Sequence, residues 1–194
     1  MAGRPRSAAC DRAILDAALY EYATRGLEGM SVDAVAARAG CSKATIYRRY
    51  PSKVELIVDA ALVIADETAP KVDTGSLRGD LTASLRNLQH LLDDPVLGAA
   101  TRNLVVDSMQ NEDLARMHGE FVAHRRRATA EQLRRAVDRG ELQPDVDLER
   151  AMDAIAGPIF YRHLVSRKPV DGAYIKAHVD DFIACYGVDA RVSS

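Results

Sequence analysis

The chain has 194 residues, of which 47% are hydrophobic and 28% charged, and its formal net charge is −2. This composition is that of an ordinary soluble globular protein, long enough for one or two domains and a substantial core. Three scattered cysteines exclude a disulfide framework or a zinc site, and no apolar run has the length of a membrane span, so we expect a reduced, cytoplasmic protein without metal, cofactor or membrane attachment.

The N-terminal segment, residues 1–9, contains Gly, Pro and the two arginines Arg4 and Arg6, but no apolar stripe. It is either a frayed tail or an arm that becomes ordered on DNA, with its arginines at a phosphate or in an adjacent minor groove. Both hold if the arm is ordered only when bound. Apolar residues on one side then predict a helix over residues 10–25, which ends at Gly26.

Two short helices with a tight turn are predicted next. Apolar residues recur at i, i+3, i+4 and i+7 from Val32, which places them on one face of a helix. Gly40 is suited to end this helix, and Ser42 can cap the following one. Two helices joined by so short a turn form a helix-turn-helix. Donors suited to phosphates and base edges follow on or just after the second helix: Lys43, Thr45, Tyr47, Arg48, Arg49 and Lys53.

Charge is distributed unevenly along the chain. Residues 1–53 hold nine Lys or Arg against five Asp or Glu, a net charge of +4, whereas residues 54–194 hold 17 against 23, a net charge of −6. Basic groups therefore gather in the segment with the helix-turn-helix, as expected of a DNA-binding domain. The alternative is a structural helical hairpin whose basic face is merely solvated.

This stretch resembles the DNA-binding signature of the tetracycline-repressor (TetR) family of bacterial regulators. The matching residues are Ser31, Ala36, Ala37, Ala39, Gly40, Ser42, Thr45, Tyr47, Tyr50 and Lys53. The resemblance implies that Ser31, Tyr47 and Lys53 hold phosphates. It also implies that the start of the second helix faces the bases through Ser42, Lys43, Ala44 and Thr45. Arg48 and Arg49 fall where the family varies, so one can contact DNA while the other faces solvent.

Cys41 lies directly before the second helix of this motif, where a small aliphatic residue is common in the family. A thiol at the N-terminus of a helix can have a lowered pKa and react with oxidants. A cysteine in a turn is more often a small, buried apolar residue. Both interpretations are open at this point.

The rest of the chain predicts helices and no strand. Ser52 and Glu55 form a capping box that begins a helix over residues 53–67, and this helix is apolar on two sides, as expected of a connector between domains. Later helix boundaries are marked by Asp94, Pro95, Gly140 and Asp147. We expect an all-α protein of about nine helices, with a three-helix DNA-binding domain at residues 1–53 and a helical ligand-binding and dimerisation domain at residues 54–194.

Two functional surfaces are expected in the second domain. The resemblance implies a ligand cavity, for which the candidate residues are His90, Asn103, Phe121, His124, Tyr161 and His163. The helix after Asp147 is apolar on more than one side and contains Gly157 and Pro158, so we expect it to form, with the last helix, the contact between two copies. The residues expected there are Ile155, Ile159, Phe182 and Tyr186. A kinked core helix in a monomer is the alternative.

No pattern of catalytic residues, phosphate-binding Gly loop or metal motif is found in the sequence, so we do not expect an enzyme. We predict a TetR-type homodimeric regulator, a repressor that a small-molecule ligand in the C-terminal domain releases from a palindromic DNA operator. One alternative is a helical enzyme or carrier with an incidental helix-turn-helix. The other is a non-specific architectural DNA binder, against which the overall acidity argues.

Overall fold

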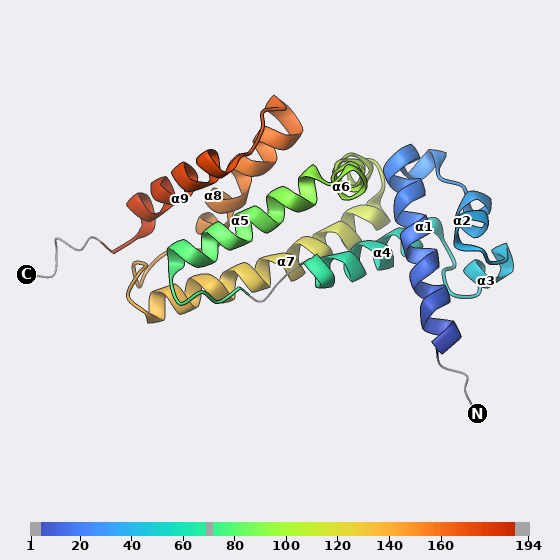
Figure 1. Cartoon of the computed structure of the whole chain (residues 1–194), viewed down its shortest axis with the longest axis horizontal. Coiled ribbons are helices and arrows are strands. Elements are labelled where there is room, and N and C mark those ends of the chain that lie inside the picture. The colour runs from blue at the N-terminus through green and yellow to red at the C-terminus, as the bar shows by residue number, and fades with distance from the viewer. Residues whose placement is uncertain (1–4, 69–71, 189–194) are drawn as a thin grey trace, which may run out of the picture. The chain divides into compact units, whose positions relative to one another are not determined.

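The computed structural model describes residues 5–68 and 72–188, and this part of the chain is helical throughout, apart from short connections and one isolated bridge between Leu142 and Gly187 (Figure 1). The α-helices are α1 (Pro5–Gly29), α2 (Val32–Ala39), α3 (Lys43–Tyr47), α4 (Lys53–Thr68), α5 (Leu77–Asp93), α6 (Pro95–Ser108), α7 (Glu112–Asp138), α8 (Leu148–Phe160) and α9 (Gly172–Tyr186). A π-helix, η1 (Tyr161–Ser166), continues α8. The all-α prediction is confirmed. No helix among these residues is long and apolar enough to cross a bilayer.

Local capping explains where several helices begin. The Asp94 carboxylate accepts hydrogen bonds from the first free N–H groups of α6, which has Pro95 at its first position. Asp147 caps α8 in the same way. At the start of α4, the Ser52 hydroxyl accepts a hydrogen bond of 3.1 Å from the Glu55 amide. These side chains bind N–H groups that the helix leaves unpaired, so the predicted starts are confirmed.

The chain divides into two compact units. One consists of Met1–Glu67 and Leu92–Val122, and the other of Thr68–Leu91 and Ala123–Ser194. The boundary between Leu91 and Leu92 falls within α5, and that between Val122 and Ala123 falls within α7. Each of these two helices therefore contributes to both units. The division at residue 53 stays a prediction.

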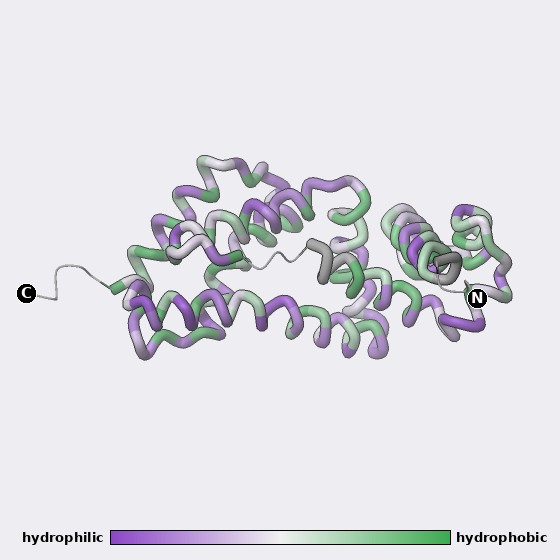
Figure 2. Tube along the Cα trace, turned by 60° about the horizontal axis from the view of Figure 1, so that its bottom comes forward, coloured by the Kyte–Doolittle hydropathy of each residue, from purple (hydrophilic) through white to green (hydrophobic). Residues whose placement is uncertain are grey.

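The first unit has one hydrophobic core, to which α1, α2, α3, α4, α6 and α7 all contribute. Its most deeply buried members are Ile14, Ala18, Tyr22, Met30, Val35, Ile46, Leu56, Ile57 and Leu114. Each fully buried large apolar side chain contributes roughly 1.5–3 kcal/mol to stability. Figure 2 shows hydrophobic and hydrophilic positions alternating along the helices, as this one-sided burial requires. This unit contains α4, α6 and part of α7 in addition to the three helices of the predicted DNA-binding domain.

A kink in α1 is held by α6. Gly26 has a φ of 67°, so the long helix is interrupted where the sequence predicts its end, and it then resumes to Gly29. The Asp107 carboxylate of α6 accepts a hydrogen bond of 3.1 Å from the Leu27 amide just after the kink. One turn earlier on α6, the Asn103 amide donates to the Tyr22 carbonyl at 2.7 Å. We call these contacts of Asn103 and Asp107 with α1 the α1–α6 clasp.

The second unit has its own core and a buried acidic group. Its buried apolar residues include Leu81, Leu85, Leu133, Ile155, Ile159, Ile175, Val179 and Phe182. Asp80 is 1% exposed, accepts hydrogen bonds from the amide and hydroxyl of Thr74 at 2.6 and 2.8 Å, and lies 3.4 Å from Arg139. The Glu141 carboxylate accepts a hydrogen bond from the Leu77 amide at 3.0 Å and thereby caps α5. Thr74 and Arg139 thus compensate the buried charge of Asp80.

Candidate nucleic-acid interface

The turn between α2 and α3 is fixed by local chemistry. Gly40 ends α2 in the left-handed conformation, with φ 66° and ψ 32°, which favours glycine. The Ser42 hydroxyl accepts a hydrogen bond of 3.2 Å from the Thr45 amide and caps α3. Ile46 is 1% exposed and anchors α3 in the core of the first unit. The predicted helix-turn-helix is present, with both helix ends where the sequence places them.

The face of α3 opposite its core anchor carries the side chains that the sequence singled out. The exposed ones are Ser42, Lys43, Ala44, Tyr47 and Arg48. Tyr47 is 48% exposed although it is a large aromatic residue. Thr45 is half-buried, and its hydroxyl lies 2.9 Å from that of Ser42. An outward face with hydroxyl, ammonium, phenol and guanidinium groups can contact both base edges and phosphates.

The basic residues of this region differ in how they are held. The Lys43 ammonium donates to the Asp33 carboxylate at 3.0 Å, and this hydrogen bond raises the pKa of Lys43. Arg48 is exposed, and no ion pair to it is found among the side chains described, those of residues 8–63 and 72–188. Arg49 lies 2.7 Å from Asp11 of α1. Of Lys43, Arg48 and Arg49, Arg48 is thus the one for which the described side chains provide no carboxylate partner.

Arg49 and Lys53 are turned toward the protein. The Arg49 side chain is 25% exposed and forms its ion pair with α1. Which of Arg48 and Arg49 contacts DNA stays a prediction. The Lys53 ammonium donates to the Leu27 carbonyl at 3.4 Å. Each would have to give up or share this interaction to reach a phosphate. Ser31 is the half-buried N-cap residue of α2, and its hydroxyl makes no capping hydrogen bond.

The N-terminal arm is shorter than the sequence suggests, because α1 begins at Pro5. Arg6 therefore lies in the first turn of a helix, and the expectation of a non-helical segment up to residue 9 is wrong. Arg4 lies outside the described residues. Residues 5–9 lack an apolar stripe, which predicts a non-helical segment. A first helical turn can nevertheless form without such a stripe.

Cys41 lies in the turn directly before α3. It is half-buried and packs against the core of the first unit, and burial is the main cause that raises its thiol pKa. A raised pKa lowers the fraction of reactive thiolate at neutral pH. The structure therefore favours the small, apolar interpretation over an oxidant sensor.

An acidic residue that the sequence analysis did not single out joins α1 to α2. Glu21 is 5% exposed, and its carboxylate lies 3.5 Å from Arg38 of α2 and 3.3 Å from Arg25 of α1. The Arg38 guanidinium also stacks 3.6 Å above the ring centre of Tyr20. These contacts fix α2 on α1. Glu21 has no sequence signal of its own, because its partner on α2 is 17 positions away.

Comparison with known proteins identifies the family. The model described as bacterial regulatory proteins, tetR family, matches residues 14–60, and that described as the tetracyclin repressor-like C-terminal domain matches residues 71–182. The chain belongs to the TetR family. It is therefore a DNA-binding transcriptional regulator, and its relatives are regulators and not enzymes.

Three known proteins illustrate the similarity of this TetR-family regulator to others. It is 34% identical over 175 residues to the HTH-type transcriptional regulator YdeS of Bacillus subtilis, covering 90% of this chain and 88% of YdeS. It is 35% identical over 186 residues to the DNA-binding transcriptional repressor TetR of Mycobacteroides abscessus, covering 93% of each. The crystal structure of the TetR family regulator SCO0332 matches with a TM-score of 0.74 and 31% identity, covering 90% of this chain and 97% of that one.

Of the residues predicted to bind a ligand in this TetR-family regulator, Asn103 contacts α1. Its amide nitrogen donates hydrogen bonds to the Tyr22 and Ala23 carbonyls of α1, and its assignment to a ligand site stays a prediction. His90 and Tyr161 are exposed, whereas Phe121, His124 and His163 are half-buried, and their assignment stays a prediction.

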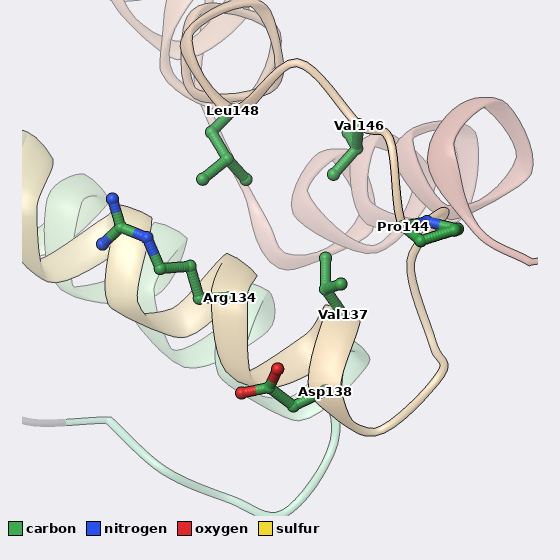
Figure 3. Close-up of a pocket in the computed structure, with 6 residues that line it drawn as sticks. All are labelled: Arg134, Val137, Asp138, Pro144, Val146 and Leu148. Atoms are coloured by element: carbon green, nitrogen blue, oxygen red, sulfur yellow. The ribbon is translucent and has the colours of Figure 1, made fainter.

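A pocket of about 270 Å³ lies elsewhere, between the end of α7 and the start of α8 (Figure 3). It is lined by Arg134, Val137, Asp138, Pro144, Val146 and Leu148, none of which was predicted to bind a ligand. The six come from the last turns of α7, the connection that follows, and the first residue of α8.

The apolar residues predicted at the dimer contact lie in the core of the subunit. Ile155, Ile159 and Phe182 are 5%, 0% and 4% exposed within a single chain. Tyr186 is half-buried, with its ring centre 4.7 Å from that of Phe182. Ile155, Ile159 and Phe182 thus have almost no surface left for a partner, and their assignment to a dimer contact stays a prediction. The exposed apolar residues nearby are Tyr161 and Val165 of η1, which are 60% and 65% exposed.

Proposed function

We propose that this regulator is a repressor that binds a pseudo-palindromic operator as a homodimer, in the cytoplasm, and leaves the operator when a small molecule binds the C-terminal domain. The observation that carries the DNA-binding part is α3, whose Ile46 is buried while Lys43, Tyr47 and Arg48 are exposed on the outer side. The sign of regulation is supported by the M. abscessus relative, which is named a repressor.

The contacts we propose follow from exposure and chemistry. Base edges are read from the start of α3, by Ser42, Lys43, Ala44 and Thr45. Phosphates are held by Tyr47, Arg48 and Ser31, and Arg4 and Arg6 extend this contact from the N-terminal side. Arg49 and Lys53 contribute less, because both are already engaged within the protein. A lysine that contacts guanine in the major groove discriminates between bases, whereas a phosphate contact positions the protein.

The DNA-binding part is tested with Lys43→Ala and Tyr47→Ala. Both side chains are exposed, so the fold should be preserved. Lys43→Ala should bind the operator about 5- to 160-fold more weakly, as expected for a base contact worth roughly 1–3 kcal/mol. Tyr47→Ala removes a proposed phosphate contact and should also weaken operator binding. Arg116→Ala is the matched control. It also removes an exposed cationic side chain, but Arg116 lies on α7 and forms its ion pair with Asp113. Fluorescence anisotropy measures affinity and a sizing column measures assembly. Wild-type affinity in both variants would refute the assignment of α3.

The dimer and ligand parts need separate tests. We propose that the contact between copies uses the outer sides of α8, η1 and α9, where a Cβ added to Gly157 would meet nothing within 4 Å. Concentration-dependent sizing measures this contact. For the ligand, a thermal-shift screen against a compound panel is followed by release from labelled operator. Only a compound with different affinities for the free and DNA-bound conformers can cause release.

A further inference from the structure

Asp33 is the only acidic residue among residues 31–53, which contain five Lys or Arg. It lies in the first turn of α2, and its carboxylate accepts the hydrogen bond of 3.0 Å from the Lys43 ammonium at the start of α3. The two side chains are 71% and 48% exposed. A carboxylate thus lies at the surface beside the first cation of the helix that we propose to enter the DNA groove.

This ion pair is not needed to hold α2 and α3 together. Exposed pairs contribute about 0–1 kcal/mol to stability, because solvent screens the charges and ordering two side chains costs entropy. Val35 and Ile46, which are 0% and 1% exposed, already fix the two helices in a common core. The consequence of the pair therefore lies in the charge that the protein presents to DNA.

We propose that Asp33 is a specificity-determining residue: it holds the Lys43 ammonium for a base edge and opposes the binding of DNA that lacks the operator sequence. The proposal rests on the proposed function of α3. Non-specific binding arises from cations that neutralise phosphates and release counterions. The ion pair of Lys43 and Asp33 carries no net charge. If the Lys43 ammonium moves toward a phosphate, that phosphate comes close to the Asp33 carboxylate, and the two anions repel each other.

A base edge makes a different demand on the same ammonium. A lysine ammonium has three donors, so Lys43 can remain bonded to Asp33 while it donates to the O6 or N7 acceptor of a guanine. The acceptor is neutral, and Asp33 is not repelled. The pair therefore distinguishes a sequence that offers such an acceptor from the phosphates that every sequence offers.

The neighbouring cations support this division of roles. Arg38 and Arg49 are each paired with a carboxylate of α1, Glu21 and Asp11. Arg48 is exposed, and the side chains that the structure describes, in residues 8–63 and 72–188, include no carboxylate partner for it. The surface of α2 and α3 thus has few unpaired cations for non-specific attraction, and freeing Lys43 would add one.

The test is Asp33→Asn in the full-length protein, with two DNA probes. One probe is the duplex that the wild-type protein enriches from a random-sequence library, and the other is a scrambled duplex of the same length and composition. On the scrambled duplex we expect affinity to rise about three- to tenfold at low salt. The slope of log affinity against log salt should steepen by about 0.9, because Lys43 then binds one more phosphate. Affinity for the enriched duplex should rise by less than about 1.5-fold, so the ratio of the two affinities should fall about twofold or more.

Two further variants separate this effect from a general loss of negative charge. Asp113→Asn removes an exposed carboxylate that pairs with Arg116 on α7 of the same unit, and it should leave the affinity ratio unchanged. Asp33→Asn combined with Lys43→Ala should lose the change in salt slope, because no ammonium is released. Thermal melts verify that each variant is folded.

An equal rise on both duplexes, or an unchanged scrambled-duplex affinity and salt slope, would overturn the role of Asp33. A steeper slope that persists without Lys43 would do the same. These outcomes leave the proposed operator binding intact as long as the wild-type protein enriches a sequence. Failure of the wild-type protein to enrich any sequence would overturn both proposals.

Discussion

Removing the carboxylate of the α1–α6 clasp should destabilise the first unit by a predictable amount. In Asp107→Ala, the partly buried Leu27 amide loses the acceptor that lies 3.1 Å away. A buried donor left without a partner costs about 1–3 kcal/mol. Asp107→Asn retains an oxygen that can accept the same hydrogen bond, so we expect it to cost less than about half as much.

Urea unfolding followed by circular dichroism measures the difference at a fixed protein concentration, because assembly would otherwise shift the midpoint. The chain has two units. If they unfold in separate transitions, the transition of the first unit is analysed by itself. A cost of Asp107→Ala below about 0.5 kcal/mol would refute the reasoning, since surface substitutions without structural consequence fall in that range. So would an equal cost for Asp107→Asn.

Three other predictions follow from side chains described above. The pKa of Tyr22 is raised above its usual 10.0, mainly by burial and to a lesser extent by the Asp107 carboxylate. The Tyr22 hydroxyl makes no well-formed hydrogen bond to a described residue. Stability should therefore be constant below pH 10 and fall as pH rises above it, and Tyr22→Phe should reduce this alkaline loss in thermal melts; an identical profile would contradict the prediction. Ile46→Ala should cost about 2–5 kcal/mol in urea unfolding and abolish operator binding in gel shifts, whereas retained binding would show that α3 does not depend on its anchor. Gly157→Glu should weaken the dimer at least tenfold in sedimentation, because it places a charge on the proposed contact; an unchanged dimer would move that contact elsewhere.

Helix boundaries were predictable because the groups that set them are close in sequence. Gly40 and Ser42 act on the residues directly around them, and Asp94 and Asp147 cap the helices that immediately follow. The sequence therefore contains both partners of each cap. The same holds for α3, where the donors Lys43, Tyr47 and Arg48 that the sequence singles out lie within six residues and are exposed.

Contacts between distant segments were not predictable from the sequence. Asn103 was expected to anchor a ligand because it is a polar residue on an apolar helix, but its partner is a carbonyl group 81 positions earlier. Periodicity identified the apolar side of α8 and α9, but it could not tell whether that side is covered by the same subunit or by a partner. Ile159 and Phe182 are covered by the same subunit. Asp33 lacked a signal until its distance to Lys43 was known.

The shortness of α3 means that its order comes from its surroundings. It spans Lys43–Tyr47, less than two turns, and a helix of that length does not persist alone in water because nucleation is unfavourable. A synthetic peptide of residues 31–53 should be unstructured and should not imitate the protein on DNA. In the intact protein, the amide hydrogens of α3 should exchange with solvent whenever the core around Ile46 opens. A substitution that loosens this core should therefore abolish recognition of the operator sequence, even if the spacing between the two α3 helices of the proposed dimer is unchanged.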